Sequence, residues 1–113
     1  MFKLLSIKQS TKIGKKYDAS FYDKDKNKYK MFSFGSKNYR DYTLINNKNS
    51  KFYIKNKEER EKVKENYQKR HAKDLLTDAS KTGMSPGALS YYILWTEPII
   101  SKGIENYKKK YNL

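Results

Sequence analysis

Cysteine is absent from this 113-residue sequence, and histidine occurs once, as His71. Without cysteine the chain can form neither a disulfide framework nor a thiolate-bound metal site. One histidine, with no second His and no Cys, leaves no zinc-ligand set and no Cys/His nucleophile, and no serine elbow motif is present to complete a Ser/His/Asp triad. We therefore predict a protein that is not an enzyme and that uses no metal and no cofactor.

Long apolar stretches are also missing. The sequence has no run of about 18 apolar residues, the length that can span a membrane, and residues 1–7 are too few for the hydrophobic segment of a signal peptide. Only 36% of the residues are hydrophobic, against 34% charged, and 113 residues is the size of one domain. We predict a soluble, non-secreted protein that forms a single small domain over residues 1–113, without membrane insertion.

Acidic side chains are scarce. The sequence has 12 Asp and Glu against 26 Lys and Arg, which gives a net charge of +14. Such a surplus attracts phosphate polymers, anionic membrane surfaces and acidic proteins, and it does not choose among them. Lysine outnumbers arginine 23 to 3, a bias that AT-rich codon usage also produces, so the charge can be functional or compositional. It amounts to +10 over residues 1–56 and +4 over residues 57–113, the distribution expected if the first half meets phosphate.

The first half of the sequence has the pattern of an antiparallel sheet. Residues 2–7 (FKLLSI) suit a short strand. The side chains of residues 16–22 and of residues 29–34 alternate between two faces with the two-residue period of half-buried strands. The polar run DKDKN between the last two supplies the turn of a hairpin. We predict a three-stranded antiparallel sheet within residues 1–45, with Gly35 at positive φ or in a bulge where the sheet ends.

The second half, residues 56–113, has helical patterns instead. Asn56 is followed three residues later by a carboxylate, which is a signal for the start of a helix. Carboxylates lie early and basic residues late in this stretch, as the helix dipole favours. We predict a charged helix from Asn56 to Leu75 whose apolar stripe is narrow.

The segment 83–111 is the predicted organising element, because it holds the only Trp, both prolines and the densest apolar run. Ser85 followed by Pro86 is typical of a helix start, and Pro98 is expected to separate this helix from a second one. The sequence therefore predicts an α+β fold, in which an N-terminal three-stranded antiparallel sheet is followed by a charged helix and a C-terminal helical corner.

Lysine and tyrosine alternate at several places in the sheet half. Nucleic-acid-binding proteins combine cations that neutralise phosphates with ring faces that stack on bases. The alternative is that the tyrosines form the core of the sheet and the lysines its solvated face. Lysine contacts to the backbone read no sequence, and Arg40 beside Asp41 is the best candidate for a fixed guanidinium. The predicted nucleic-acid-binding residues are Lys15, Lys16, Lys28, Lys30, Lys37 and Arg40, with Tyr29 and Tyr39 as stacking rings.

A second candidate surface is predicted around the only tryptophan. Trp95 and Tyr91 can anchor a partner protein. Val63 and Tyr67 lie on the narrow apolar stripe of the charged helix, and a partner protein can cover that stripe. A Trp within a run of Ile and Leu is more often a core residue, and that alternative stays open at this point.

Three blocks of the sequence carry a resemblance to a known group of proteins. They are Phe34-Gly35 with Tyr39, Asp41, Tyr42 and Thr43; Tyr67 with Arg70 and His71; and Gly87–Ser90 with Tyr92–Trp95, Pro98 and Tyr107–Lys109. Over about residues 28–113 the chain thereby resembles a family of small basic proteins of unknown function from nucleocytoplasmic large DNA viruses, the giant viruses. The resemblance implies a viral context, in which small basic proteins are packaged with the genome or built into the capsid.

Composition and resemblance together predict a non-enzymatic, virion-associated protein that binds nucleic acid backbone, DNA in preference to RNA, without strong sequence specificity. The alternative is a minor capsid or scaffold component whose charge meets acidic virion proteins, and a third hypothesis is a protein directed at the host. The expected location is the virion, or the host cytoplasm and virus factory. A continuous basic face would favour nucleic acid, whereas an exposed apolar patch of several hundred Å² would favour assembly.

Overall fold

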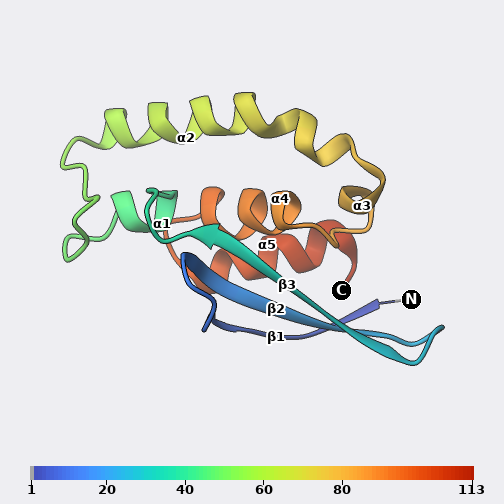
Figure 1. The fold of residues 1–113 in the computed structure, drawn as a ribbon. Helices are drawn as coiled ribbons and strands as arrows, with labels where there is room; N and C mark the ends of the chain where they lie inside the picture. The colour runs from blue at the N-terminus through green and yellow to red at the C-terminus, as the bar shows by residue number, and fades with distance from the viewer. Residues whose placement is uncertain (1) are drawn as a thin grey trace.

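Three antiparallel strands form the N-terminal part of the protein. The computed structural model describes residues 2–113. In it β1 (Phe2–Gln9), β2 (Lys15–Asp23) and β3 (Lys28–Ser36) pair in the order β1-β2-β3 (Figure 1). The predicted sheet and its hairpin are therefore confirmed. β1 extends beyond the apolar run at its start, and its register against β2 shifts at Leu5, where the strand bulges.

Alternation places the apolar side chains of the sheet on one face. Ala19 and Phe21 of β2 and Phe34 of β3 are fully buried beneath the helices, whereas Tyr22 and Tyr29 are paired across the two strands on the opposite face. The predicted two-residue period of β2 is thus the observed one. Near the end of β3, Gly35 has a φ of 76°, the left-handed geometry that the sequence predicts there.

Helices cover the apolar face of the sheet. They are α1 (Tyr42–Ile45), α2 (Lys57–His71), the 3₁₀ turn η1 (Ala72–Leu76), α3 (Asp78–Lys81), α4 (Pro86–Leu89), the π-helical turn η2 (Ser90–Leu94) and α5 (Ile100–Tyr111). In Figure 1 α4 and α5 lie between the sheet and α2, and both α4 and η2 contact β3. The architecture is therefore the predicted α+β one. No helix within residues 2–113 is both long enough and apolar enough to cross a membrane.

The C-terminal corner turns at Pro98 as predicted, but its first helix is not a regular α-helix. The Ser85 side chain caps α4 by accepting a hydrogen bond from the amide of Ala88 at 3.0 Å. After four residues the chain widens into η2. There α5 packs so closely that a Cβ at Gly103 would lie 2.2 Å from the carbonyl oxygen of Ile93. The corner therefore depends on a backbone contact that only glycine permits.

The hydrophobic core joins the sheet to this corner. Leu89, Ile93, Leu94 and Tyr107 are at most 1% exposed, and they belong to one cluster with the buried side chains of β2 and β3. The Tyr107 hydroxyl donates a hydrogen bond to the carbonyl of Gly83 at 2.6 Å. Its polar atom is thus satisfied inside the core, as burial of a tyrosine requires.

α2 is the predicted charged helix, and it is shorter than predicted. Asn56 caps its start by accepting a hydrogen bond at 3.0 Å from an amide of the first turn. Regular α-helix ends at His71, so the stretch up to the predicted end at Leu75 belongs to η1 instead. No residue of α2 is fully buried, and Val63 and Tyr67 pack partly against the core. This is the narrow stripe that the sequence predicts.

Candidate nucleic-acid interface

A cleft of about 510 Å³ opens between the end of β3 and α2, and we refer to it as the β3–α2 cleft. It is lined by Lys16, Gly35, Ser36, Tyr39, Arg40 and Asp41 from the sheet and the segment after it, by Val63, Asn66, Tyr67, Arg70 and His71 of α2, and by Ser90, Leu94 and Trp95 of the corner. Sites for small ligands have volumes of about 300–1,000 Å³. The cleft is therefore large enough to hold one.

Three aromatic rings form a column along one wall of the β3–α2 cleft. The Tyr67 ring lies 4.0 Å from the Trp95 ring at 6° and 4.2 Å from the His71 ring at 29° between planes. Two rings this close cannot share one face of Tyr67, so they cover opposite faces. Burial, followed by the negative charge of Asp74, raises the pKa of Tyr67 to about 12. The Tyr67 hydroxyl is therefore neutral at physiological pH and adds no negative charge to the cleft.

A buried ion pair holds the segment that follows β3. The Lys16 ammonium donates to the Asp41 carboxylate at 2.6 Å and to the carbonyl of Tyr39 at 2.8 Å, and the two paired side chains are 11% and 2% exposed. The Asp41 carboxylate also accepts from the amide of Leu44 at 3.0 Å, which caps α1. The chain is thus fastened on both sides of Arg40, and we refer to this arrangement as the Lys16–Asp41 clamp.

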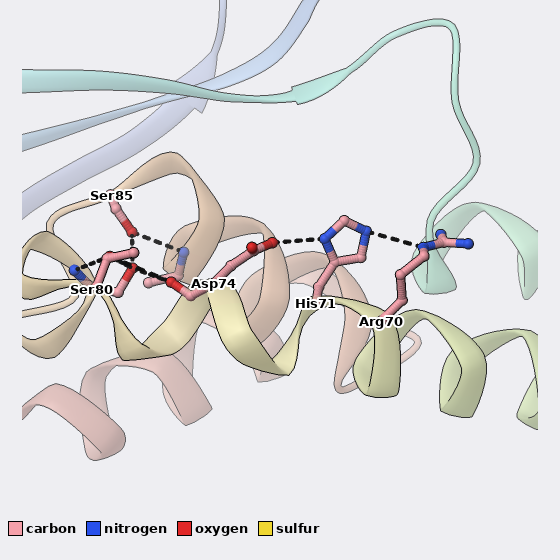
Figure 2. Close-up of polar contacts among 7 residues, drawn as sticks. Arg70, His71, Asp74, Ser80 and Ser85 are labelled. Carbon is pink, nitrogen blue, oxygen red and sulfur yellow. Dashed lines mark hydrogen bonds and ion pairs between the residues drawn. The ribbon is translucent and has the colours of Figure 1, made fainter.

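Two guanidinium groups at the β3–α2 cleft have no carboxylate partner among the described residues. Arg40 is exposed on the fastened segment. Arg70 donates from its Nε to Nε2 of His71 at 3.4 Å, and Nδ1 of His71 lies 2.7 Å from the Asp74 carboxylate (Figure 2). The cleft's only lining carboxylate, Asp41, is neutralised by Lys16. The mouth of the cleft is therefore positively charged.

The residue types of a serine-hydrolase triad come together beside this cleft, but not in its geometry. Figure 2 shows Asp74 between His71 and two serines. The Ser80 hydroxyl donates to the main-chain carbonyl of Asp74 at 2.7 Å and lies 2.7 Å from the Ser85 hydroxyl. In a catalytic triad the serine hydroxyl hydrogen-bonds to the histidine ring. Here Ser80 is 2% exposed and closes the η1–α3 turn, so the cluster is structural.

The predicted nucleic-acid-binding residues separate into two groups. Lys15 and Lys37 are exposed near the cleft end of the sheet, where the Lys37 amide bonds to the loop before β2. Lys28 and Lys30 lie at the far end of β3, roughly 25 Å away by the rise per residue of a strand. Tyr29 is 76% exposed beside them, but strand alternation places its ring on the opposite face. The structure therefore does not join the eight residues into one surface.

Two of the predicted residues at the cleft end have different environments. Lys16, predicted to contact phosphate, presents no free ammonium because the clamp with Asp41 buries and neutralises it. Tyr39, predicted as a stacking ring, is 72% exposed at the cleft. Within residues 2–113 its ring contacts no other aromatic ring. Its faces can therefore receive a base, whereas Lys16 acts only on the position of its neighbours.

The four predicted partner-interface residues gather on the inner side of α2. Trp95 is 5% exposed and belongs to the core, so it is not an exposed anchor, and the alternative of a core tryptophan holds. Tyr67 stacks on it, Tyr91 lies 6.5 Å from Tyr67, and Val63 is partly buried against the same cluster. These side chains stabilise the contact between α2 and the corner instead of forming an outer surface.

Arg70 and His71 line the cleft but were not among the predicted binding residues. A signal was present, because Arg70 and His71 lie three and four residues after Tyr67, on the same side of a helix. The spacing does not show which segment the helix faces. A second cleft of about 390 Å³ shares Lys16 and Asp41 with the first and adds exposed Lys37 and Lys51. The clamp therefore separates two basic depressions.

Among residues 2–113 no group of three or more His, Asp or Glu side chains is placed so that it could hold a metal ion. Comparisons of the chain with protein-family models, with curated proteins and with solved structures find no match.

Proposed function

We propose that this protein binds nucleic acid through the phosphate backbone, without strong sequence specificity and without catalysing a reaction. The observation that carries the proposal is a set of four exposed basic side chains, which we refer to as the cation cluster. Arg40 and Arg70 line the β3–α2 cleft, and Lys15 and Lys37 lie at the adjoining end of the sheet, where Lys15 pairs with Ser36. In the described range 2–113 no carboxylate forms an ion pair with any of them. Their charges are therefore available to an external anion.

Nucleic acid is the anion whose chemistry fits best. Each phosphate that a basic side chain neutralises releases condensed counterions, and several such contacts give micromolar affinity without base recognition. Guanidinium groups such as those of Arg40 and Arg70 can donate two hydrogen bonds to one phosphate. The net charge of +14 adds long-range attraction to the same polymer. DNA is the proposed polymer because the sequence resembles proteins of large DNA viruses, where a basic protein would accompany the packaged genome in the virion or virus factory.

The test is a salt series of binding measurements. Fluorescence anisotropy with unrelated duplex DNA, single-stranded DNA and RNA should give micromolar or tighter binding at about 150 mM salt, with affinity falling steeply as salt rises. Absence of binding to all three polymers at that salt would rule the proposal out.

A charge-matched pair of variants locates the contact. Lys15→Gln with Lys37→Gln removes two members of the cation cluster and should lower the slope of log affinity against log salt by about 1.8 on duplex DNA. Lys109→Gln with Lys110→Gln removes the same charge from the end of α5 and should change the slope by less than half as much. Equal effects of the two pairs would mean that only net charge matters.

The capsid or scaffold alternative has one observation in its favour. Tyr29 and Met31 on β3 and Leu5 on β1 are 76%, 53% and 46% exposed on the sheet, and exposed apolar side chains on a sheet suit a protein contact. Substitution of Met31 and Leu5 by Gln should leave DNA binding unchanged. If the protein binds no nucleic acid and these substitutions release it from purified virions, the assembly function replaces the first proposal.

A further inference from the structure

We infer that the β3–α2 cleft holds one unpaired nucleotide of a single strand, with its phosphate on Arg40 and Arg70 and its base against Tyr39. The inference rests on the proposed function, because it names the form of nucleic acid that this site selects. It predicts a preference for single strands and strand ends over continuous duplex, which contact with the cation cluster alone would not give.

The phosphate position follows from the charges at the cleft. Asp41 is the only carboxylate in the lining, and Lys16 already neutralises it at 2.6 Å. Arg40 and Arg70 approach from opposite walls, one from the segment after β3 and one from α2, with Arg70 held against His71. An anion between them would be bound from two sides, with no competing negative group in the lining.

The Lys16–Asp41 clamp makes the β3 wall rigid before the ligand arrives. Lys16 bonds to the Tyr39 carbonyl and to the Asp41 side chain, so the residues on either side of Arg40 are both fastened to β2. Little backbone freedom is then lost when Arg40 binds a phosphate, and preorganisation of this kind strengthens binding. Lys16 is accordingly a positioning residue in this inference, not a contact residue.

Tyr39 determines that the nucleotide is unpaired. Its ring is 72% exposed at the cleft, whereas Tyr67 is covered on both faces by Trp95 and His71. A base inside a duplex is already stacked and paired, so only a splayed or single-stranded base can lie against Tyr39. A volume of about 510 Å³ also limits the ligand to a small group inserted from the strand.

Two variants and a matched control test the inference by anisotropy on single-stranded and duplex DNA of equal length. Tyr39→Ala removes the exposed ring without changing the charge. It should weaken single-strand binding by about 10-fold, the loss of one stacked base, while leaving duplex binding within twofold. Arg70→Gln should weaken single-strand binding more than Lys69→Gln does. Lys69 is the neighbouring residue on α2, pairs with Glu65, and is not among the residues that line the cleft.

The single tryptophan gives a direct signal of occupancy. Because Trp95 lines the cleft and is the only Trp, a nucleoside monophosphate should change its emission in the wild type and much less in Tyr39→Ala, with free tryptophan titrated in parallel to correct for absorption by the base. Inorganic phosphate should bind both proteins equally and weakly.

The outcomes separate this inference from the function on which it rests. If polymers bind with steep salt dependence but Tyr39→Ala lowers single-strand and duplex affinity equally, or lowers neither, the nucleotide site is wrong and backbone binding stands. If the monophosphate and inorganic phosphate give the same response in both proteins, the cleft is a plain phosphate site and the inference is overturned. If no polymer binds at about 150 mM salt, the proposed function fails and the inference fails with it.

Discussion

Gly103 is the residue at which α5 comes closest to the preceding turn. A Cβ built at this position would lie 2.2 Å from the carbonyl oxygen and 2.9 Å from the carbonyl carbon of Ile93. Both atoms belong to the backbone, so they cannot move aside as a side chain can. Gly103→Ala should therefore destabilise the protein by about 2–3 kcal/mol through overpacking, although the same change in an ordinary helix interior is stabilising. Urea unfolding followed by circular dichroism measures it.

Gly87 provides the matched control for Gly103. It also lies in a helix, but the nearest atom to a Cβ there is Cβ of Asp74 at 3.5 Å, an ordinary contact. Gly87→Ala should therefore stabilise the protein by up to about 1 kcal/mol. Loss of stability in both variants would mean that the contact with Ile93 is not what distinguishes Gly103 from another helical glycine.

At the scale of single residues, the sequence predicted what local chemistry decides. The capping by Asn56 and Ser85 and the positive φ of Gly35 follow from near neighbours, and all three are observed. The sequence does not predict the Lys16–Asp41 clamp, because the two residues are 25 positions apart and nothing in the sequence marks them as partners. An exposed lysine and a buried one look alike in a sequence, which is why Lys16 was assigned to phosphate.

At the scale of elements, α2 depends on its ends more than on its burial. No residue of α2 is fully buried, and its first turn is held by the Asn56 side chain, which accepts from the amide of Glu59 at 3.0 Å. Asn56→Ala should cost about 1 kcal/mol of stability and raise amide exchange in that turn. Asn56→Asp keeps the capping oxygen and should stay within about 0.5 kcal/mol of wild type. Equal losses in the two variants would show that the cap contributes nothing.

The elements that the sequence missed are those set by packing. Side-chain periodicity predicts the strands, and a capping residue predicts the start of α2. The π-helical turn η2 instead lies in a stretch whose apolar spacing also fits an α-helix. In η2 the consecutive residues Ile93 and Leu94, with Trp95 after them, are all buried. A wider turn is one way to bury so many neighbours at once. These neighbouring residues are buried because the sheet packs on one side of η2 and α2 on the other. The local sequence does not show that both sides are covered.

At the scale of the whole molecule, the candidate site could be predicted only in part. The charge asymmetry and the Lys/Tyr alternation indicated the sheet half, and Tyr39 and Arg40 are indeed at a cleft. The other wall comes from α2, more than 20 positions further along the chain, so Arg70 joins the site only through the tertiary fold. Strand geometry then moves Lys28 and Lys30 to the opposite end of the sheet.

Buried tyrosines make the stability of the whole molecule sensitive to alkaline pH. Burial is the largest cause that raises the pKa of Tyr42, Tyr67 and Tyr111 to about 12, from an ordinary value of 10.0. Between these values the folded state keeps protons that the unfolded state has lost. The stability that these groups contribute is therefore complete below pH 10 and is lost as pH rises from about 10 to about 12.

Tyr67→Phe isolates one part of this loss. The rise of the Tyr67 pKa from 10.0 to about 12 corresponds to roughly 2 kcal/mol after allowance for partial exposure. The variant should therefore lose about that much less stability than wild type between about pH 9 and pH 12. Lysine deprotonation lowers the net charge equally in both proteins, and comparison of the two slopes removes it. Tyr39→Phe, at an exposed position outside the core, should behave as wild type. Parallel slopes for Tyr67→Phe and wild type in urea unfolding would show that the Tyr67 hydroxyl is hydrated in the folded protein, and the wall of the β3–α2 cleft would then be open to water beneath its aromatic column.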